Sequence, residues 1–570
     1  MKKKSLLVFG IIVTVISIGI CLSTIDNQNS LESLKKQGNQ IAVYIQDDAG
    51  EYQTNNIDKF PTHGYVLNTK KSSCKNGSII SQNESTKKIK IRVLNNDECS
   101  LYFDTEVTAL ALNKLGITVK DGTPDFSKIA PEIGSYIDDQ FNGNELSRSQ
   151  SASYQERYYT YADSYTFDEI AGTYTLVNPQ ICKYSECYDN LVNKYIVSSS
   201  GSTKNSGESS SDKKNIYKVT NNTTLDTLYY ILSTKTNIYN LEKDGVYAME
   251  DDYGISYYYR GAVTNNYVKF GKWNKDVYYG YYDATSLTSY STYNSLEECQ
   301  ASSQFNVNCK MGIAKGADMW WRIIRINGNG TLRVIYDGTS AHDNGEISID
   351  RTLARSNWNE NYSNDAKYVG YMYGGANGEI STSKIQAQTN QTDSTIKTYL
   401  DTWYQENILA TGNAKYVSDT LFCNDRTTDG IGFGGANNDF DYGSYIRAKN
   451  SKPQFKCPEK NDAFTVSDTT KGNGALTYPV GLVTVDELVV AGTQWLKSSK
   501  GFYLNKGVTY WSLSPREFSN KASYNFWSSG DLNSSQVTAN MHVVPVINLS
   551  SEFIENIVGD GTATNPYTIE

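Results

Sequence analysis

Three aspartates in the C-terminal half of the chain have the type and spacing of cation ligands. Asp425 follows Cys423 after one residue, and Asp439 and Asp441 flank Phe440. Calcium takes several oxygen ligands, many of them from carboxylates on loops. These aspartates are therefore candidate calcium ligands, and apart from this candidate calcium we expect no cofactor. The alternative is that they are solvated loop acids that form Asx turns with the nearby backbone.

Aromatic residues near the end of the chain are candidates for contact with a ligand. Trp511, Tyr524 and Trp527 lie within a short stretch of strand-like sequence. Aromatic faces stack on the C–H surfaces of sugars, and exposed Trp and Tyr side chains anchor many binding sites. We expect these three residues to contact a ligand. The alternative is that Trp511 and Trp527 belong to the hydrophobic core.

Eight cysteines beyond Cys21 fall into near neighbours along the chain. They could pair in many ways, but short loops between consecutive partners are the simplest assignment. We expect Cα atoms ~4.4–6.8 Å apart in each pair. The expected disulfides are Cys74–Cys99, Cys182–Cys187, Cys299–Cys309 and Cys423–Cys457. Buried free thiols are the alternative, and zinc is disfavoured because the chain has no Cys-x-x-Cys pair and only three histidines.

The sequence contains none of the common catalytic signatures. We find no Gly-x-Ser-x-Gly elbow, His-Glu-x-x-His helix, Walker loop or EF-hand loop. The formal net charge of −9 argues against a nucleic-acid partner, which a basic surface would favour. These observations favour a protein that binds a ligand without transforming it.

The N-terminus has the pattern of an export segment. Lys2, Lys3 and Lys4 precede an uncharged run from Leu6 to Leu22. This polarity predicts a signal-anchor helix over residues 1–23, with the N-terminus inside the cell and the bulk of the chain outside. We therefore expect a membrane protein with a single span. The alternatives are a secreted protein whose signal is cleaved, and a lipoprotein attached through Cys21.

Composition and strand-like runs divide the remainder of the chain. The 45 tyrosines, with abundant polar residues and only 10 prolines, are typical of twisted β-sheet. We expect an α+β fold that is mostly β. A polar stalk (24–38) precedes a small β-domain (39–105) with strands at 41–45, 64–67, 88–93 and 99–103. A helix at 106–116 opens a Tyr/Ser-rich region (106–243) with strands near 173–177 and 215–220 and a flexible loop at 198–214. The C-terminal domain covers 244–570.

Several elements of the C-terminal domain can be predicted from local signals. Two strand-like runs around Asn265 and Asn266, at 257–263 and 267–270, predict a hairpin, and a second hairpin is expected at 320–336 around an Asn-Gly turn. A helix at 394–404 would begin at Ser394 or Asp393, and one at 484–491 begins with a Thr484–Glu487 capping box. Closing strands are expected at 509–513 and 542–549.

These elements resemble a large, uncharacterised family of bacterial surface domains. The matching segments are Trp321-Arg-Ile-Ile-Arg-Ile326, the helix at 394–404 and the runs at 479–488, 510–515 and 543–549. The family is similar in shape to the C-type-lectin fold, which formylglycine-generating enzymes share. The resemblance covers about 245–550 and implies a C-type-lectin-like domain. The small two-cysteine β-domain also looks like one found ahead of such domains.

Three functions are consistent with this sequence. The first is a membrane-anchored extracellular binding protein, adhesin-like or specific for a surface glycan or protein ligand. The second is a structural or filament-associated component of the envelope. The third is a glycan-processing enzyme, which would need two carboxylates ~5–10 Å apart across a cleft.

Overall fold

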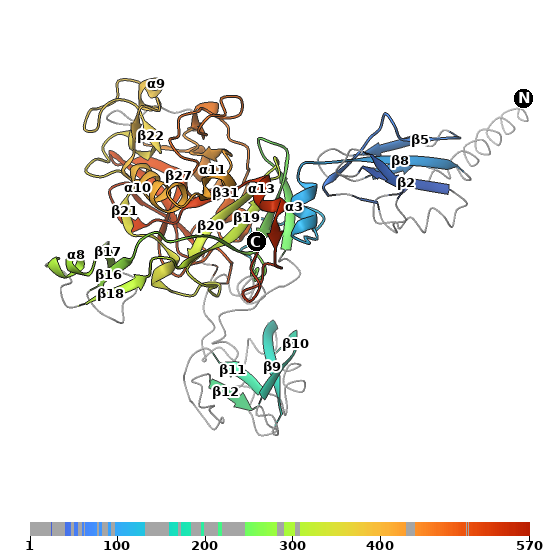
Figure 1. Ribbon diagram of the computed structural model, residues 1–570, viewed down its shortest axis with the longest axis horizontal. Coiled ribbons are helices and arrows are strands. Elements are labelled where there is room, and N and C mark those ends of the chain that lie inside the picture. Colours follow the sequence, from blue (N-terminus) through green and yellow to red (C-terminus); the bar gives the residue numbers. More distant parts are fainter. Residues whose placement is uncertain are drawn as a thin grey trace, which may run out of the picture.

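The computed structural model describes most of the chain (Figure 1). It covers 24–25, 40–46, 51–54, 60–61, 63–76, 79–82, 89–92, 97–130, four strands between 159 and 218, 245–281, 290–293, 295–302, 308–428, 439–497, 499 and 501–569. The fold is mostly β with few helices, as predicted. None of the helices in these ranges is long and apolar enough to cross a membrane, which corrects the transmembrane helix in the predicted fold class. Residues 1–23 lie outside these ranges.

The small β-domain contains the predicted strands. Its main sheet has the order β3 (Tyr52–Thr54), β2 (Gln40–Gln46), β8 (Glu98–Thr105), β4 (Tyr65–Leu67), with β5 (Ser73–Cys74) also paired to β8. Val43, Leu67, Leu101 and Phe103 form a core of its own. A second sheet has the order β1 (Thr24–Ile25), β7 (Ile89–Arg92), β6 (Ile79–Gln82), so the predicted stalk begins with a short strand.

The chain after the small domain belongs to the large C-terminal domain. Helix α3 (Ala109–Lys114) ends before Gly116, whose φ of +59° lies in the left-handed region, and Leu112 and Phe126 join the large core. The backbone of Ala130 donates to Gly492 O at 2.7 Å. The structure thus groups 109–130 with the C-terminal domain rather than with the middle region.

Residues 131–244 are an insertion between these two parts of the large domain. Its described strands form one sheet in the order β10 (Thr173–Lys183), β9 (Tyr159–Asp168), β11 (Tyr195–Ser198), β12 (Asn215–Lys218). Strands were predicted at both 173–177 and 215–220. The predicted loop at 198–214 lies outside the described residues except for Ser198.

The first large sheet has the order β13 (Gly245–Glu250), β14 (Ile255–Arg260), β19 (Asp318–Ile326), β20 (Leu332–Gly338), β31 (Val546–Leu549). The hairpin at 320–336 is confirmed by the pairing of β19 with β20. The other predicted hairpin is wrong, because β14 and β15 (Tyr267–Lys272) both pair antiparallel to β19 and follow each other along it. The chain stays on the same edge of β19 between these two strands because Asn266 bonds to that edge. The Asn266 O accepts from Ile323 N at 2.9 Å, and the Asn266 side chain donates to Ile323 O at 2.8 Å.

The second large sheet is formed mainly by the last hundred residues. Its order is β21 (Arg355–Asn357), β30 (Asn540–His542), β27 (Tyr510–Ser519), β28 (Ala522–Ser528), β29 (Leu532–Gln536), with β25 (Phe440–Asp441) also on β27. The strand predicted at 542–549 is therefore two strands in different sheets. Pro545 between them has no N–H for a continuous ladder, so the chain crosses from one sheet to the other there.

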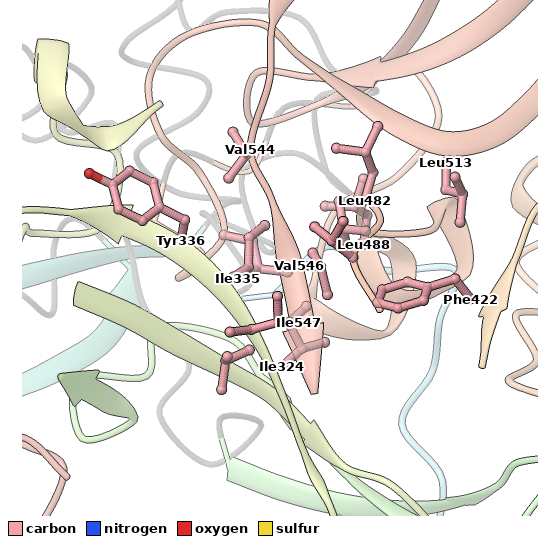
Figure 2. Packing of buried hydrophobic residues seen from close by; sticks show 14 of the residues in the cluster. Ile324, Ile335, Tyr336, Phe422, Leu482, Leu488, Leu513, Val544, Val546 and Ile547 are labelled. Atoms are coloured by element: carbon pink, nitrogen blue, oxygen red, sulfur yellow. The ribbon is translucent and has the colours of Figure 1, made fainter. Parts of the chain in front are cut away.

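Helix α12 (Val485–Ala491) packs with both sheets around one hydrophobic core. Figure 2 shows Ile324, Ile335 and Ile547 of the first sheet near Leu482 and Leu488, and all five are fully buried. The capping box is confirmed: Thr484 Oγ1 accepts from Glu487 N at 3.2 Å, and Glu487 Oε2 accepts from Thr484 N at 2.9 Å. The same glutamate has a second role in the core.

Glu487 links α12 to the first sheet through buried ion pairs. Its Oε1 lies 3.1 Å from Nε of Arg325 and 2.5 Å from Nε of Arg333. Arg325 also contacts Asp251 at 2.6 Å. Buried charges need such partners because desolvation of an isolated ion costs several kcal/mol. Helix and sheet positions are therefore coupled through one carboxylate.

A loop with a buried histidine connects β20 to β21. Nδ1 of His342 lies 3.0 Å from Glu346 Oε1, and its Nε2 lies 3.2 Å from Asp350 Oδ2. Burial alone would lower the pKa of His342, but these two carboxylates, with a smaller contribution from Asp337, raise it above its usual value. The protonated form of His342 therefore has two carboxylate partners in this loop.

A Glu487→Gln variant should lose a large part of the folding stability. The change leaves Arg333 without a charged partner in the core, and breaking a buried pair in this way costs about 3–5 kcal/mol. Urea denaturation would measure the loss. The matched control is Glu250→Gln, which breaks an exposed pair with Lys456 and should cost about 0–1 kcal/mol. Equal effects of the two variants would contradict the structural role of Glu487.

The contribution of His342 to stability should depend on pH. Its folded pKa is raised, so this contribution is fully present below the unfolded pKa of about 6.5 and is lost as pH rises through the folded pKa. The difference in melting temperature between wild type and His342→Gln should therefore be larger at about pH 5 than at about pH 9. A difference that grows with pH would refute this assignment.

Candidate functional site

Three of the four predicted disulfides are present. Cys299–Cys309 and Cys423–Cys457 have Cα atoms 6.0 and 5.6 Å apart. The Cα distance of Cys74–Cys99, 4.1 Å, lies just below the expected range, because these residues face each other directly across β5 and β8. The fourth pair, Cys182–Cys187, lies outside the residues whose side chains are described.

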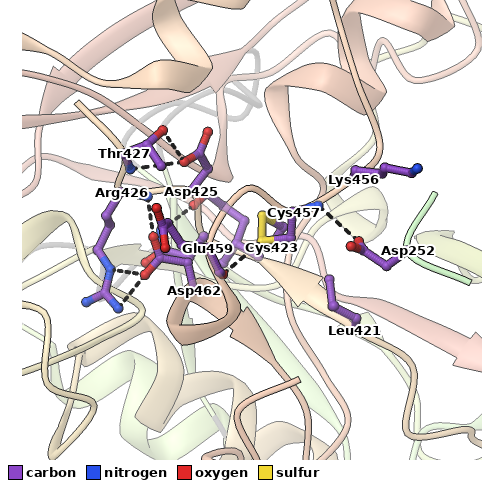
Figure 3. Close-up of a disulfide and its surroundings, with 12 residues drawn as sticks. Asp252, Leu421, Cys423, Asp425, Arg426, Thr427, Lys456, Cys457, Glu459 and Asp462 are labelled. Carbon is purple, nitrogen blue, oxygen red and sulfur yellow. Dashed lines mark hydrogen bonds and ion pairs between the residues drawn. A yellow bond between two sulfur atoms is a disulfide. The ribbon is translucent and has the colours of Figure 1, made fainter. Parts of the chain in front are cut away.

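The three candidate calcium ligands do not come together among the described residues. Figure 3 shows Asp425 beside the Cys423–Cys457 disulfide, where its Oδ1 accepts from Thr427 N and Oγ1 at 3.0 and 2.6 Å. Its Oδ2 lies 2.7 Å from the guanidinium of Arg447, which supplies the positive charge that calcium was expected to supply. The alternative interpretation, an Asx turn, is therefore the correct one for Asp425.

The other two candidate ligands lie apart from Asp425. Asp439 is exposed and accepts from Asn520 N at 3.0 Å, whereas Asp441 is in β25 opposite Glu517. Within the described ranges, a single group of three His, Cys, Asp or Glu residues brings ligand atoms within 4.8 Å of one another: Cys74, Asp97 and Cys99. Its two sulfurs are joined in a disulfide.

The three predicted aromatic ligands do not converge on one surface. Trp511 is fully buried, and its Nε1 donates to Ser356 O at 2.9 Å, so the prediction that it contacts a ligand is wrong. Trp527 and Tyr524 are half-buried. Their register in the pairing of β28 with β29 is regular, and positions three apart in a strand point to opposite faces. These side chains therefore cannot form one platform.

The structure instead contains a cleft of about 650 Å³ next to helix α10 (Thr395–Tyr404). The helix begins at Ser394, whose Oγ accepts from Lys397 N at 3.3 Å, as predicted. Its Ile396, Leu400 and Trp403 are buried. Helical residues along one side of the cleft, including the π-helical turn η5 (Gln405–Leu409), are Thr395, Thr398, Tyr399, Thr402, Trp403, Glu406 and Asn407.

The opposite wall comes from an arm that projects from the large domain (Figure 1). The arm consists of β16 (Val277–Tyr281), β17 (Tyr290–Tyr293), α8 (Leu296–Ala301) and β18 (Cys309–Ile313). Cys299–Cys309 joins α8 to β18. The arm and the chain before it contribute Trp273, Lys275, Val277, Tyr279, Thr292 and Tyr293 to the cleft. The disulfide therefore stabilises one wall of the cleft.

The remaining lining residues lie in or near β21 and the short strands β22 (Met372–Tyr373) and β23 (Thr392–Asp393). They are Leu353, Ala354, Ser356, Asn359, Tyr373, Asn377 and Asp393. Ser356 is the residue whose carbonyl accepts the Trp511 N–H. Trp511 thus supports the cleft from behind its wall.

Aromatic side chains of the cleft are held by contacts within the core. Trp273 Nε1 donates to the Tyr336 hydroxyl at 3.2 Å, and the Trp403 ring meets the Trp321 ring edge-on with centroids 6.1 Å apart. Burial raises the pKa of Tyr373 to about 12, so its hydroxyl stays protonated at neutral pH. Tyr293 and Tyr399 are only half-buried and offer more of their surface to a ligand.

The charged groups of the cleft are paired with each other or with neighbours. Lys275 Nζ lies 2.7 Å from Glu406 Oε2. Asp393 lies 3.1 Å from the buried Nζ of Lys397, which also contacts Asp401 at 2.7 Å. Burial raises the pKa of Asp401 despite the nearby lysine. Asp393 precedes α10 and Glu406 follows it, and the helix of 10 residues between them is roughly 15 Å long, at ~1.5 Å per residue.

The sequence predicted helix α10, which lines this cleft, but it did not predict the cleft itself. The buried face of α10 has apolar residues at helical spacing, whereas threonines on the neighbouring face give no chemical signal of their own. The sequence feature that could have indicated the cleft is the Thr-x-x-Thr-Tyr-x-x-Thr pattern beside the apolar stripe of this helix. The arm is brought to this face by contacts between distant segments.

We compared the chain with family models, curated proteins and solved structures. No family model, no curated protein and no solved structure matches it. The C-type-lectin-like fold therefore stays a prediction.

Proposed function

We propose that this chain is an exported binding protein whose cleft beside α10 takes a carbohydrate. The observation that carries the proposal is the lining of the cleft, which contains both aromatic rings and hydroxyl and amide side chains. Aromatic rings stack on sugar C–H surfaces, while convergent polar groups fix the orientation of a bound molecule. The cleft volume of about 650 Å³ is within the usual range for small-molecule sites.

Binding fits this cleft better than glycoside hydrolysis. A hydrolase of the usual kind places two carboxylates ~5–10 Å apart around the bond to be cleaved. The two carboxylates among the described lining residues lie near opposite ends of α10, and each has a lysine partner. We therefore propose recognition, as in an adhesin or a glycan-binding surface protein.

The disulfides support a location outside the cytoplasm. Three bridges are present, and structural disulfides persist mainly in oxidising compartments. Surface glycans are found in that environment, so location and proposed ligand agree.

Blocking the cleft should abolish glycan binding. Thr398 is exposed and lines the middle of the helical wall, so Thr398→Arg fills the cleft with a long side chain. We expect at least about a tenfold loss of affinity, equivalent to ~1.4 kcal/mol, in calorimetric titration with the best ligand from a glycan array. The matched control is Gln405→Arg, which adds the same group on the same helical segment outside the cleft and should bind as wild type. Equal binding by both variants would exclude the cleft as the binding site.

Removing the arm disulfide should weaken binding more than it affects the rest of the fold. In Cys299→Ala/Cys309→Ala the wall that carries Tyr279 and Tyr293 loses its covalent link, which typically contributes ~2–4 kcal/mol. We expect a lower glycan affinity with the main melting transition retained. Cys74→Ala/Cys99→Ala, in the small β-domain, should leave the affinity unchanged. The reverse pattern would remove the arm from the proposed site.

A further inference from the structure

We infer that the ligand is an uncharged, linear oligosaccharide that lies along α10. This inference rests on the proposed function and specifies the chemistry of its ligand. It follows from the shape of the helical wall, from the pairing of charges in the cleft and from the hydrogen-bonding groups that the helix exposes.

The shape of the cleft favours an extended molecule. Thr395, Thr398, Thr402 and Glu406 follow one another at spacings of three or four residues, so they form a continuous stripe along the helix, with Tyr399 next to it. At ~1.5 Å per residue the stripe is roughly 16 Å long. A single sugar would contact only part of it, whereas a short linear chain would contact its whole length.

The charges of the cleft favour a neutral molecule. Lys275 is the one cation among the described lining residues, and it is paired with Glu406 at 2.7 Å. Asp393 shares the buried amine of Lys397 with Asp401. A carboxylate or phosphate on the ligand would therefore have to displace Glu406 from Lys275 before it gained a partner. An uncharged ligand leaves both ion pairs intact.

The hydroxyls of the stripe are suited to ligand hydroxyls. Thr402 Oγ1 donates to Thr398 O at 2.9 Å, and Thr398 Oγ1 donates to Ser394 O at 3.2 Å. Because each of these hydroxyl hydrogens is used within the helix, the oxygens offer acceptor lone pairs to the cleft. Acceptors attract the O–H groups of a neutral sugar and repel anionic oxygens.

Three oligosaccharide series test the inference with the intact protein. N-acetylglucosamine oligomers are neutral, their deacetylated counterparts are cationic, and uronic-acid oligomers are anionic. We expect the neutral series to bind most tightly, with an affinity that rises from monosaccharide to short oligomer and then levels off. This affinity should stay constant between about 0.05 and about 0.5 M salt, because no net charge is neutralised on binding.

Different failures have different meanings. Tighter binding of either charged series, or a monosaccharide as tight as the oligomers, would overturn this inference while the proposed function stands. Failure of all three series, and of neutral glucose oligomers, to bind would overturn the proposed function together with the inference.

A charge variant adds a gain-of-function test. Glu406→Gln leaves Lys275 without its carboxylate, so the variant should bind the uronic-acid series at least about fivefold more tightly than wild type, and salt should remove the gain. The matched control is Asp318→Asn, which releases Lys269 and Lys272 outside the cleft and should leave anion affinity unchanged. An unchanged preference in Glu406→Gln, or an equal gain in Asp318→Asn, would refute the role given to the Lys275–Glu406 pair.

Discussion

The architecture of the large domain depends on the neutralisation of buried charges. Glu487 caps α12 and is also the partner of Arg325 and Arg333 on adjacent strands. Burial alone would raise the pKa of this carboxyl, but the charges of the two arginines lower it below its usual value. Since none of the three ions is stable alone in the core, the helix and the sheet can pack closely only when they are correctly aligned.

A second buried network extends this alignment to the cleft. Asp337, at the end of β20, lies 2.7 Å from Arg351 and 2.6 Å from Lys506. Arg351 immediately precedes the segment that contributes Leu353, Ala354 and Ser356 to the cleft wall. Burial lowers the pKa of Lys506 to about 8, with Asp337 opposing that shift. The position of this cleft wall is therefore linked to the first large sheet by ion pairs as well as by apolar packing.

Local sequence patterns predicted the helices and strands well, but they predicted less well which distant residues these contact. The β19–β20 hairpin, the helix at Ser394 and the capping box at Thr484 were recognised because turn and cap residues act over a few positions. The β14–β15 hairpin was wrong because Asn266 bonds to Ile323, far along the chain. The surroundings of Asp425 and Trp511 could not be predicted for the same reason: Arg447 and Ser356, which are their partners, are not their neighbours in sequence. The cleft could not be predicted because its two walls are separate segments whose polar residues carry no signature.

The interrupted large domain has a consequence for the order in which the protein can fold. The segment with α3 buries Leu112 and Phe126 against strands that follow the insertion, so it has no core to join until about 110 further residues have been made. At ~5–20 residues per second, this delay lasts roughly ten seconds. During that time an apolar helix is open to contacts with other chains. The time during which this helix stays exposed in synthesis is therefore determined by the length of the insertion.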